Sequence, residues 1–154
     1  FGRFGFSDVL TLLLVMDSYV ELYKGGIVPL ADFVNMPYDR DILVRVIVKK
    51  TAAHYSYKSV RISKTDFPVL TCAAALTQEG VQAAVGARPA KAALVKDAEQ
   101  LATLPMTGEK AQAFAEYAAG LLPTETNPRG SAAYRTHLIK VLTARCLTEL
   151  GGKA

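Results

Sequence analysis

The sequence lacks the motifs that most enzymes of nucleotide or acyl chemistry depend on. Neither GxGxxG nor GxxxxGK occurs, which excludes the common glycine loops that hold phosphates. No Ser, His and Asp set and no Cys and His pair has the spacing of a nucleophilic site. His54 and His137 each stand alone, and we interpret His137, in an expected helix, as a packed or surface side chain. An independent enzyme is therefore not expected from these residues.

Cysteine is scarce, and long apolar runs are absent. Cys72 and Cys146 are far apart, and each lies in an apolar run. This arrangement predicts two buried free thiols rather than a disulfide, a zinc site or an iron–sulfur cluster, and it favours a reducing compartment. The longest apolar run, residues 9–16, is too short to span a bilayer. We therefore expect a cytoplasmic protein without a membrane span.

Blocks of like charge are absent as well. The 18 Lys and Arg and the 14 Asp and Glu residues are scattered, with a net charge of +4. Without a basic stripe, nucleic-acid binding is not supported, whereas a weakly acidic, phosphate-bearing ligand would fit. A chain that is 51% hydrophobic and 21% charged is typical of soluble globular proteins. The opening "FGRFGF" has neither an initiator Met nor a signal-peptide pattern, so we expect a fragment of something longer.

The hydrophobic pattern that is present predicts an α+β fold in two parts. For residues 1–50 we expect a helix over 8–16 that Asp8 can cap, strands over 18–24 and 41–50, a glycine turn at 25–26 and a helical turn at 31–34. For residues 53–154 we expect a three-stranded antiparallel meander over 54–61, 68–76 and 81–87, then three helices over 91–102, 108–122 and 132–150. Ser131 is expected to cap the last helix.

The segment "YKSVRISKTDFPVL", residues 57–70, carries the densest polar pattern. Lys58 lies in an expected strand, where a lysine commonly faces solvent. Arg61, Lys64 and Asp66 lie on the expected turn, where a solvated ion pair contributes well under ~1 kcal/mol. The residues alone therefore predict an α+β domain with a polar hairpin and nothing more specific.

Three segments in order resemble the C-terminal domain of the FAD-binding medium subunit of molybdenum hydroxylases, the family of carbon monoxide, xanthine and nicotinate dehydrogenases. They are "YKSVRISKTDFPVLTCAAAL" (57–76), "AAVGARPAKAALVKDAEQLA" (83–102) and "GSAAYRTHLIKVLTARCL" (130–147). Residues 1–50 are similar to the end of the family's middle FAD subdomain, and residues 53–154 to its C-terminal domain. The family's glycine-rich loop would lie upstream of Phe1.

The resemblance implies a set of residues that contact FAD and no catalytic or metal-binding residue. These contacts would be Asp8, Leu43 and Lys58, with Tyr57 and Asp66 as weaker candidates on the same hairpin. A lysine near N1 and C2=O of the flavin would stabilise the negative charge that gathers there on reduction. A carboxylate at position 8 would accept hydrogen bonds from cofactor hydroxyls, and Leu43 would shield a ring face. Arg61 and Lys64 are expected to be mostly solvated.

The resemblance also implies partners. A large subunit would carry molybdopterin, and a small subunit would carry two [2Fe–2S] clusters. Electrons would pass through FAD in this subunit to NAD or another acceptor, with no role for nucleic acid. A different hypothesis makes the chain a non-catalytic subunit-assembly domain in which Lys58 faces solvent. The hydroxylated substrate and the physiological acceptor are not determined by this chain.

Overall fold

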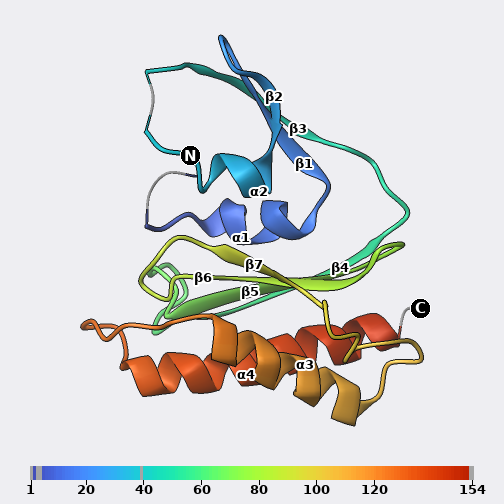
Figure 1. The fold of residues 1–154 in the computed structure, drawn as a ribbon. Coiled ribbons are helices and arrows are strands. Elements are labelled where there is room, and N and C mark those ends of the chain that lie inside the picture. Colours follow the sequence, from blue (N-terminus) through green and yellow to red (C-terminus); the bar gives the residue numbers. More distant parts are fainter. Residues whose placement is uncertain (1, 3–4, 39, 153–154) are drawn as a thin grey trace.

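The computed structural model describes residue 2, residues 5–38 and residues 40–152, and it shows an α+β protein built in four layers (Figure 1). The first two layers are a three-stranded sheet and the helices α1 (Asp8–Val15) and α2 (Leu30–Phe33). A four-stranded sheet follows, and the helices α3 (Gly108–Leu121) and α4 (Ala132–Gly151) form the last layer. The α+β class predicted from the sequence is confirmed.

The N-terminal sheet consists of β1 (Ser18–Leu22), β2 (Gly26–Pro29) and β3 (Leu43–Val48), which are antiparallel in the order β2-β1-β3. The predicted glycine turn lies between β1 and β2, where Gly26 has φ +70°, a conformation that glycine adopts without steric cost. Along β1 the buried positions alternate with half-buried ones, as in a strand with one covered face. The buried apolar side chains of β1 pack with those of α1 and α2.

The C-terminal sheet is an antiparallel meander of β4 (His54–Val60), β5 (Leu70–Thr77), β6 (Gly80–Gly86) and β7 (Ala93–Lys96), in that order. Strand β5 is covered on both faces. Its Cys72 and Ala74 belong to the core beneath α3 and α4, whereas Ala73 and Ala75 belong to the core beneath α1 and α2. Small side chains on both faces allow helices to approach this strand closely from either side.

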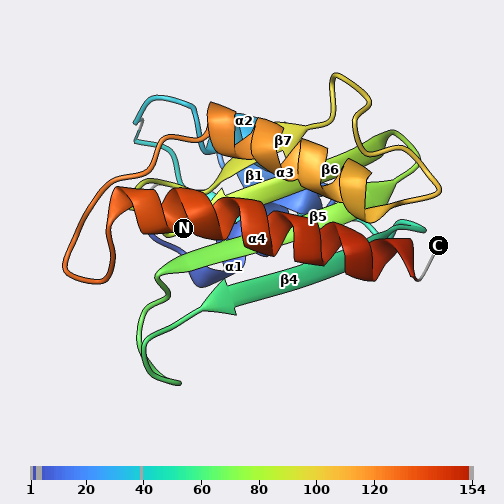
Figure 2. The same ribbon diagram turned by 90° about the horizontal axis from the view of Figure 1, so that it is seen from below.

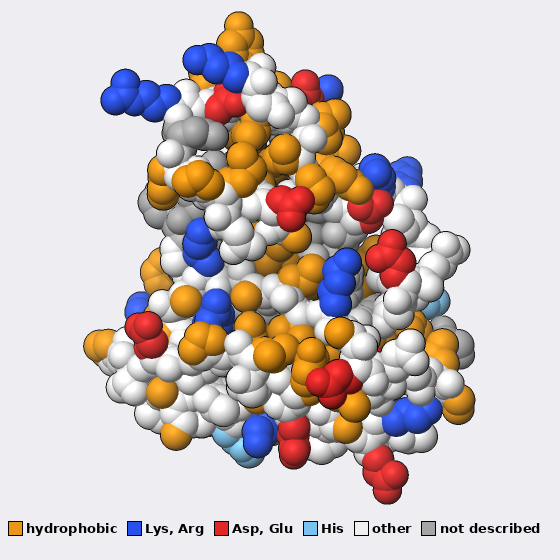
Figure 3. Space-filling view, in the orientation of Figure 1, with side chains coloured by type: hydrophobic (Ala, Val, Ile, Leu, Met, Phe, Trp, Pro, Cys, Tyr) orange, Lys and Arg blue, Asp and Glu red, His pale blue; other side chains and the backbone are white. Residues whose placement is uncertain are grey.

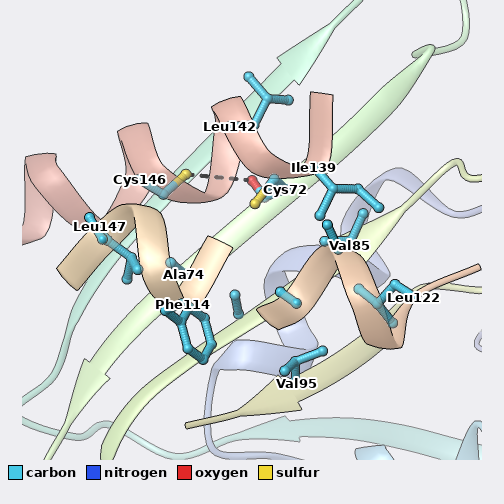
Figure 4. Close-up of a cluster of buried hydrophobic side chains, with 14 of the residues drawn as sticks. Cys72, Ala74, Val85, Val95, Phe114, Leu122, Ile139, Leu142, Cys146 and Leu147 are labelled. Atoms are coloured by element: carbon cyan, nitrogen blue, oxygen red, sulfur yellow. Dashed lines mark hydrogen bonds between the residues drawn. The ribbon is translucent and has the colours of Figure 1, made fainter. Parts of the chain in front are cut away.

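Helices α3 and α4 cross one face of the C-terminal sheet, with β4 at the sheet edge beside α4 (Figure 2). Phe114 of α3 and Ile139 and Leu147 of α4 are fully buried against the sheet in the larger core (Figure 4). Ser131 accepts a hydrogen bond from the backbone N–H of Tyr134, so the predicted N-cap of α4 is confirmed.

The helix predicted over residues 91–102 is wrong. Residues 93–96 form β7, which pairs with β6 so that Val95 lies opposite Ala83 and Leu94 opposite Ala84. The alanines and lysines of this segment favour a helix locally, but pairing with β6 and burial of Val95 override that weak preference. After β7 the chain forms turns, and the Asp97 carboxylate accepts hydrogen bonds from the backbone of residues 101 and 102 at 2.9 and 2.8 Å.

Helix α1 packs closely on the C-terminal sheet beside Gly86, the last residue of β6. The hydroxyls of Thr11 on α1 and Thr71 on β5 are buried and hydrogen-bond to each other at 2.8 Å. Gly86 lies beside this pair, and a Cβ there would come within 2.7 Å of the Thr71 hydroxyl and closer still to that of Thr11. The contact therefore requires glycine at position 86 and fixes the N-terminal half of the molecule against the sheet.

The surface carries interspersed charges of both signs on the face shown in Figure 3, where hydrophobic side chains gather over the upper, N-terminal part. Four apolar residues on β3 and just before it are exposed: Ile42, Val44, Val46 and Val48. Among the described helices, none combines the length and hydrophobicity that a membrane crossing needs.

Candidate functional site

Arg61 joins the two halves of the molecule at the end of β4. Its Nη2 donates a hydrogen bond at 2.9 Å to Oδ1 of Asp8, the first residue of α1. Its Nη1 donates at 2.6 Å to the backbone carbonyl of Asp66, on the far side of the hairpin. Only 27% of the Arg61 side chain is exposed. The hairpin between β4 and β5 is thus held to the start of α1 by a single guanidinium group.

Tyr57 of β4 lies beside Arg61, which directly follows the strand, and the two side chains hydrogen-bond. Burial raises the pKa of the Tyr57 phenol, and the negative charge of Asp8 raises it further, whereas Arg61 acts in the opposite direction. The ring is still partly exposed. Asp8, Tyr57 and Arg61 therefore form one half-exposed cluster of a carboxylate, a neutral phenol and a guanidinium, which we call the α1 cluster.

The tip of the hairpin extends this cluster toward an aromatic pocket. The Asp66 carboxylate accepts a hydrogen bond from the backbone N–H of Phe67 and lies 3.5 Å from Nη2 of Arg129. The Phe67 ring stacks edge-to-face with Phe6 and lies under the Arg129 guanidinium. A pocket of about 260 Å³ is lined by Phe6, Phe67, Arg129 and Arg135 among others.

Lys58 lies on the opposite face of β4, beneath α4. Its Nζ donates a hydrogen bond at 2.7 Å to Oε2 of Glu149, and the Ser56 hydroxyl donates to the same oxygen at 2.9 Å. The hydrogen bond to Glu149 raises the pKa of the Lys58 ammonium, against a smaller opposing effect of burial. The ammonium is therefore neither free in solvent nor directed toward the α1 cluster.

Leu43 lies in another layer, at the start of β3, where it packs against the core beneath α1 and α2. The structure thus gathers Asp8, Tyr57 and Asp66, three of the five residues expected to contact the cofactor, around Arg61. It does not bring Lys58 or Leu43 into that group.

Two expectations about individual charges are wrong. Asp8 provides no side-chain cap: it is the first residue of α1 and pairs with Arg61, while Ser7 occupies the N-cap position. Arg61 is not mostly solvated, because a carboxylate and a carbonyl hold it. Lys64 is exposed as expected. Arg61 was missed because its partner is 53 positions away in the sequence, although its shared face with Tyr57 was available from the two-residue period.

The thiols and the larger cavity lie away from the α1 cluster. Cys72 and Cys146 are free and buried, as predicted. A cleft of about 550 Å³ lies between β1, α2 and the β5–β6 turn, and its lining includes the buried Ser18. Within the described residues, no group of three or more His, Cys, Asp and Glu side chains could hold a metal ion.

Comparison with protein families adds an independent result. The CO dehydrogenase flavoprotein C-terminal domain family matches residues 55–150, which is more than half of the chain. No curated protein matches the chain.

Solved structures share the fold. Quinoline 2-oxidoreductase from Pseudomonas putida 86 is 21% identical, with a TM-score of 0.78 over 99% of this chain and 58% of the other. Carbon monoxide dehydrogenase from Hydrogenophaga pseudoflava is 20% identical, with a TM-score of 0.82 over 99% and 58%. Reconstituted CO dehydrogenase from Oligotropha carboxidovorans is 19% identical, with a TM-score of 0.74 over 99% and 59%. The chain therefore spans less than two thirds of the length of these similar chains.

Proposed function

Because the chain belongs to the CO dehydrogenase flavoprotein C-terminal domain family, we propose that it forms part of the FAD-binding subunit of a molybdenum-dependent hydroxylase. In this proposal a partner subunit carries molybdopterin and oxidises the substrate, and a small partner subunit carries [2Fe–2S] clusters. FAD held by this subunit would supply electron-transfer chemistry between these clusters and NAD or another acceptor. The similarity to quinoline and carbon monoxide oxidoreductases supports this assignment at the level of fold.

The observation that carries the proposal is the α1 cluster, which the fold assembles from both halves of a chain in this flavoprotein family. FAD presents carbonyl and ring-nitrogen acceptors as well as hydroxyl donors. The cluster offers groups of matching chemistry: the Arg61 guanidinium and Tyr57 hydroxyl as donors, and the Asp8 carboxylate as an acceptor. All three are partly exposed, so a ligand can reach them. The residues present therefore fit this cofactor.

FAD, when bound, supplies reversible electron-transfer chemistry. In our proposal Arg61 provides the fixed positive charge that favours the extra electron density of the reduced state. Asp8 orients the Arg61 guanidinium, and Tyr57 is a neutral hydrogen-bonding group, since a phenol is protonated at neutral pH and burial raises its pKa further. Asp66 fixes the hairpin through its carbonyl.

Lys58 and Leu43 lie outside the α1 cluster, and their contacts with the cofactor remain predictions. The role of Lys58 as the cation beside the flavin stays a prediction, and its hydrogen bond to Glu149 on the opposite face argues for Arg61 instead. Leu43 stays a predicted apolar contact from β3. A substitution at each cation separates the two assignments.

The test uses the complete complex with Arg61→Met, Lys58→Met and, as a matched control at the exposed hairpin tip, Lys64→Met. We expect Arg61→Met to reduce the flavin content or lower the flavin midpoint potential, and Lys64→Met to change neither. A normal flavin content and potential in Arg61→Met, with a loss in Lys58→Met, would transfer the role to Lys58. The isolated 154-residue chain is expected not to retain FAD, which its visible absorption spectrum would show.

A second candidate function, a non-catalytic assembly domain, is favoured by the exposed apolar side chains of β3. Val44 and Val48 are 53% and 40% exposed, as is typical of a surface that another protein covers. Under this hypothesis Val44→Asp would prevent assembly of the complex, measured by size-exclusion chromatography. Arg61→Met would then leave both flavin content and acceptor turnover unchanged.

A further inference from the structure

The two cysteines, 74 positions apart, meet between β5 and α4. The Cys146 thiol donates to the backbone carbonyl of Cys72 at a sulfur–oxygen distance of 4.0 Å (Figure 4). The Cys72 sulfur lies 3.4 Å from the hydroxyl of Thr143. Thr143 and Cys146 are three positions apart on α4 and therefore share a face. Both thiols thus belong to one contact between the strand and the helix, and both are fully buried.

A polar row leads from this contact to the edge of the sheet. Cys72 lies opposite Lys58 in the register of β5 and β4, so the two side chains share a face. Glu149 follows Cys146 by three positions on α4 and holds Lys58 and Ser56. Lys58 and Glu149 are 31% and 39% exposed, and β4 is the edge strand. The thiols therefore lie one side chain away from solvent, behind an ion pair.

The two thiols differ in acidity. Contact with Cys72 lowers the pKa of the Cys146 thiol, and a hydrogen bond from Ser56 and the charge of Lys58 act in the same direction against burial. Contact with Cys146 and complete burial raise the pKa of the Cys72 thiol. In such a pair the more acidic thiol forms the attacking thiolate, and the other reacts second.

We propose that Cys72 and Cys146 form an oxidisable dithiol pair that a small peroxide converts into a disulfide linking β5 to α4. The Cys146 thiolate attacks one oxygen of hydrogen peroxide, the O–O bond breaks, and a sulfenic acid and hydroxide form. The Cys72 sulfur then attacks the sulfenic sulfur, an S–S bond forms, and hydroxide leaves as water with the Cys72 proton. Overall the two thiols lose two hydrogens and one peroxide becomes two waters.

The burial of the pair selects the oxidant. A bulky disulfide reagent cannot reach a sulfur with no exposed surface, whereas peroxide is close to water in size and can pass the edge at Lys58 and Glu149. The pair is thus protected from thiol–disulfide exchange with large reagents, and Cys72 next to Cys146 favours the disulfide over further oxidation of one sulfur.

The test treats the native protein with hydrogen peroxide, blocks remaining thiols with an alkylating agent after denaturation, and maps the peptides by mass spectrometry. We expect a Cys72–Cys146 cross-linked peptide with a mass lower by two hydrogens and reversal by dithiothreitol. A bulky aromatic disulfide reagent should react with neither thiol in the folded protein. Conversion of methionines to sulfoxides reports that the peroxide dose was sufficient.

Two variants locate the first step. In Cys72→Ser the sulfenic acid on Cys146 should persist and react with a dimedone probe, whereas Cys146→Ser should leave Cys72 unoxidised. The proposal is overturned if peroxide oxidises the methionines while both wild-type cysteines are recovered alkylated. It is equally overturned by a disulfide between two chains, or by sulfinic acid on Cys146 beside an unmodified Cys72. These outcomes are read on the wild-type protein and do not depend on folding of the variants.

Discussion

Arg135 is a buried charged side chain whose removal should cost substantial stability. It is 1% exposed on α4, and its guanidinium donates four hydrogen bonds that bind the loop before α4 to the start of β5. The acceptors are the carbonyls of Val69, Glu125 and Gly130 at 3.0, 2.6 and 2.7 Å, and Oδ1 of Asn127 at 2.6 Å.

Arg135→Met keeps most of the length of the side chain but removes all four hydrogen bonds. The Gly130 carbonyl and Oδ1 of Asn127 keep a second donor, the backbone N–H of Asn127 and of Arg129 respectively. The carbonyls of Val69 and Glu125 lose their Arg135 donor, and at about 1 kcal/mol or more for each unsatisfied buried acceptor the loss is about 2 kcal/mol or more. Arg135→Lys should recover only part of this loss, because an ammonium cannot reproduce the planar fork of a guanidinium. Urea unfolding monitored by circular dichroism gives the free energy of unfolding of each variant.

Arg145→Met is the matched control, because Arg145 lies on the same helix but is exposed. It should change the free energy of unfolding by less than about 0.5 kcal/mol. The reasoning fails if Arg135→Met and Arg145→Met lose similar stability, or if Arg135→Lys is as stable as the wild type.

Two further perturbations test the contacts that join the layers. Gly86→Ala should destabilise the protein by about 1–3 kcal/mol, because the added methyl forces the buried Thr11–Thr71 pair apart. Gly120→Ala, on α3 where an added Cβ meets open space and φ is not positive, is the control for this clash and should not be destabilising. The pair of Lys58 and Glu149 predicts a pH dependence. Since the hydrogen bond raises the pKa of Lys58 in the folded protein, its contribution is complete below the unfolded value of 10.5 and is lost as the pH rises through the higher folded value. Thermal unfolding in alkaline buffers should show this decline in the wild type and a smaller one in Glu149→Gln.

Most of the strands and helices could be predicted from the sequence because their periods are clear. The alternating pattern of residues 54–61 and the capped, apolar pattern of α4 leave little choice locally. The segment 91–102 could not be predicted in this way. Its composition favours a helix. Residues 93–96 are extended because they pair with β6, and a local sequence pattern does not reveal that pairing.

The candidate site shows the same limit at the level of single charges. The alternating pattern of residues 54–61 predicts Tyr57 and Arg61 on one face and Lys58 on the other, and this much is readable from the sequence. The residues that contact each face cannot be read from the sequence in this way. Asp8 meets Arg61 and Glu149 meets Lys58 through contacts between elements that are more than fifty positions apart. The sequence led us to predict Lys58 as the acting cation and Arg61 as solvated, whereas the cation bound at the junction with α1 is Arg61.

The alanine-rich strand β5 has a consequence for motion. The chain crosses between the two sheets at residues 49–53, which would be the natural hinge. Opening such a hinge would separate α1 from the buried alanines of β5 and expose apolar surface on both sides, besides breaking the Thr11–Thr71 hydrogen bond. The two halves therefore behave as one rigid body. Asp8 and Arg61, which approach each other from opposite sides of this seam, are preorganised, so a ligand that binds them does not have to bring them together.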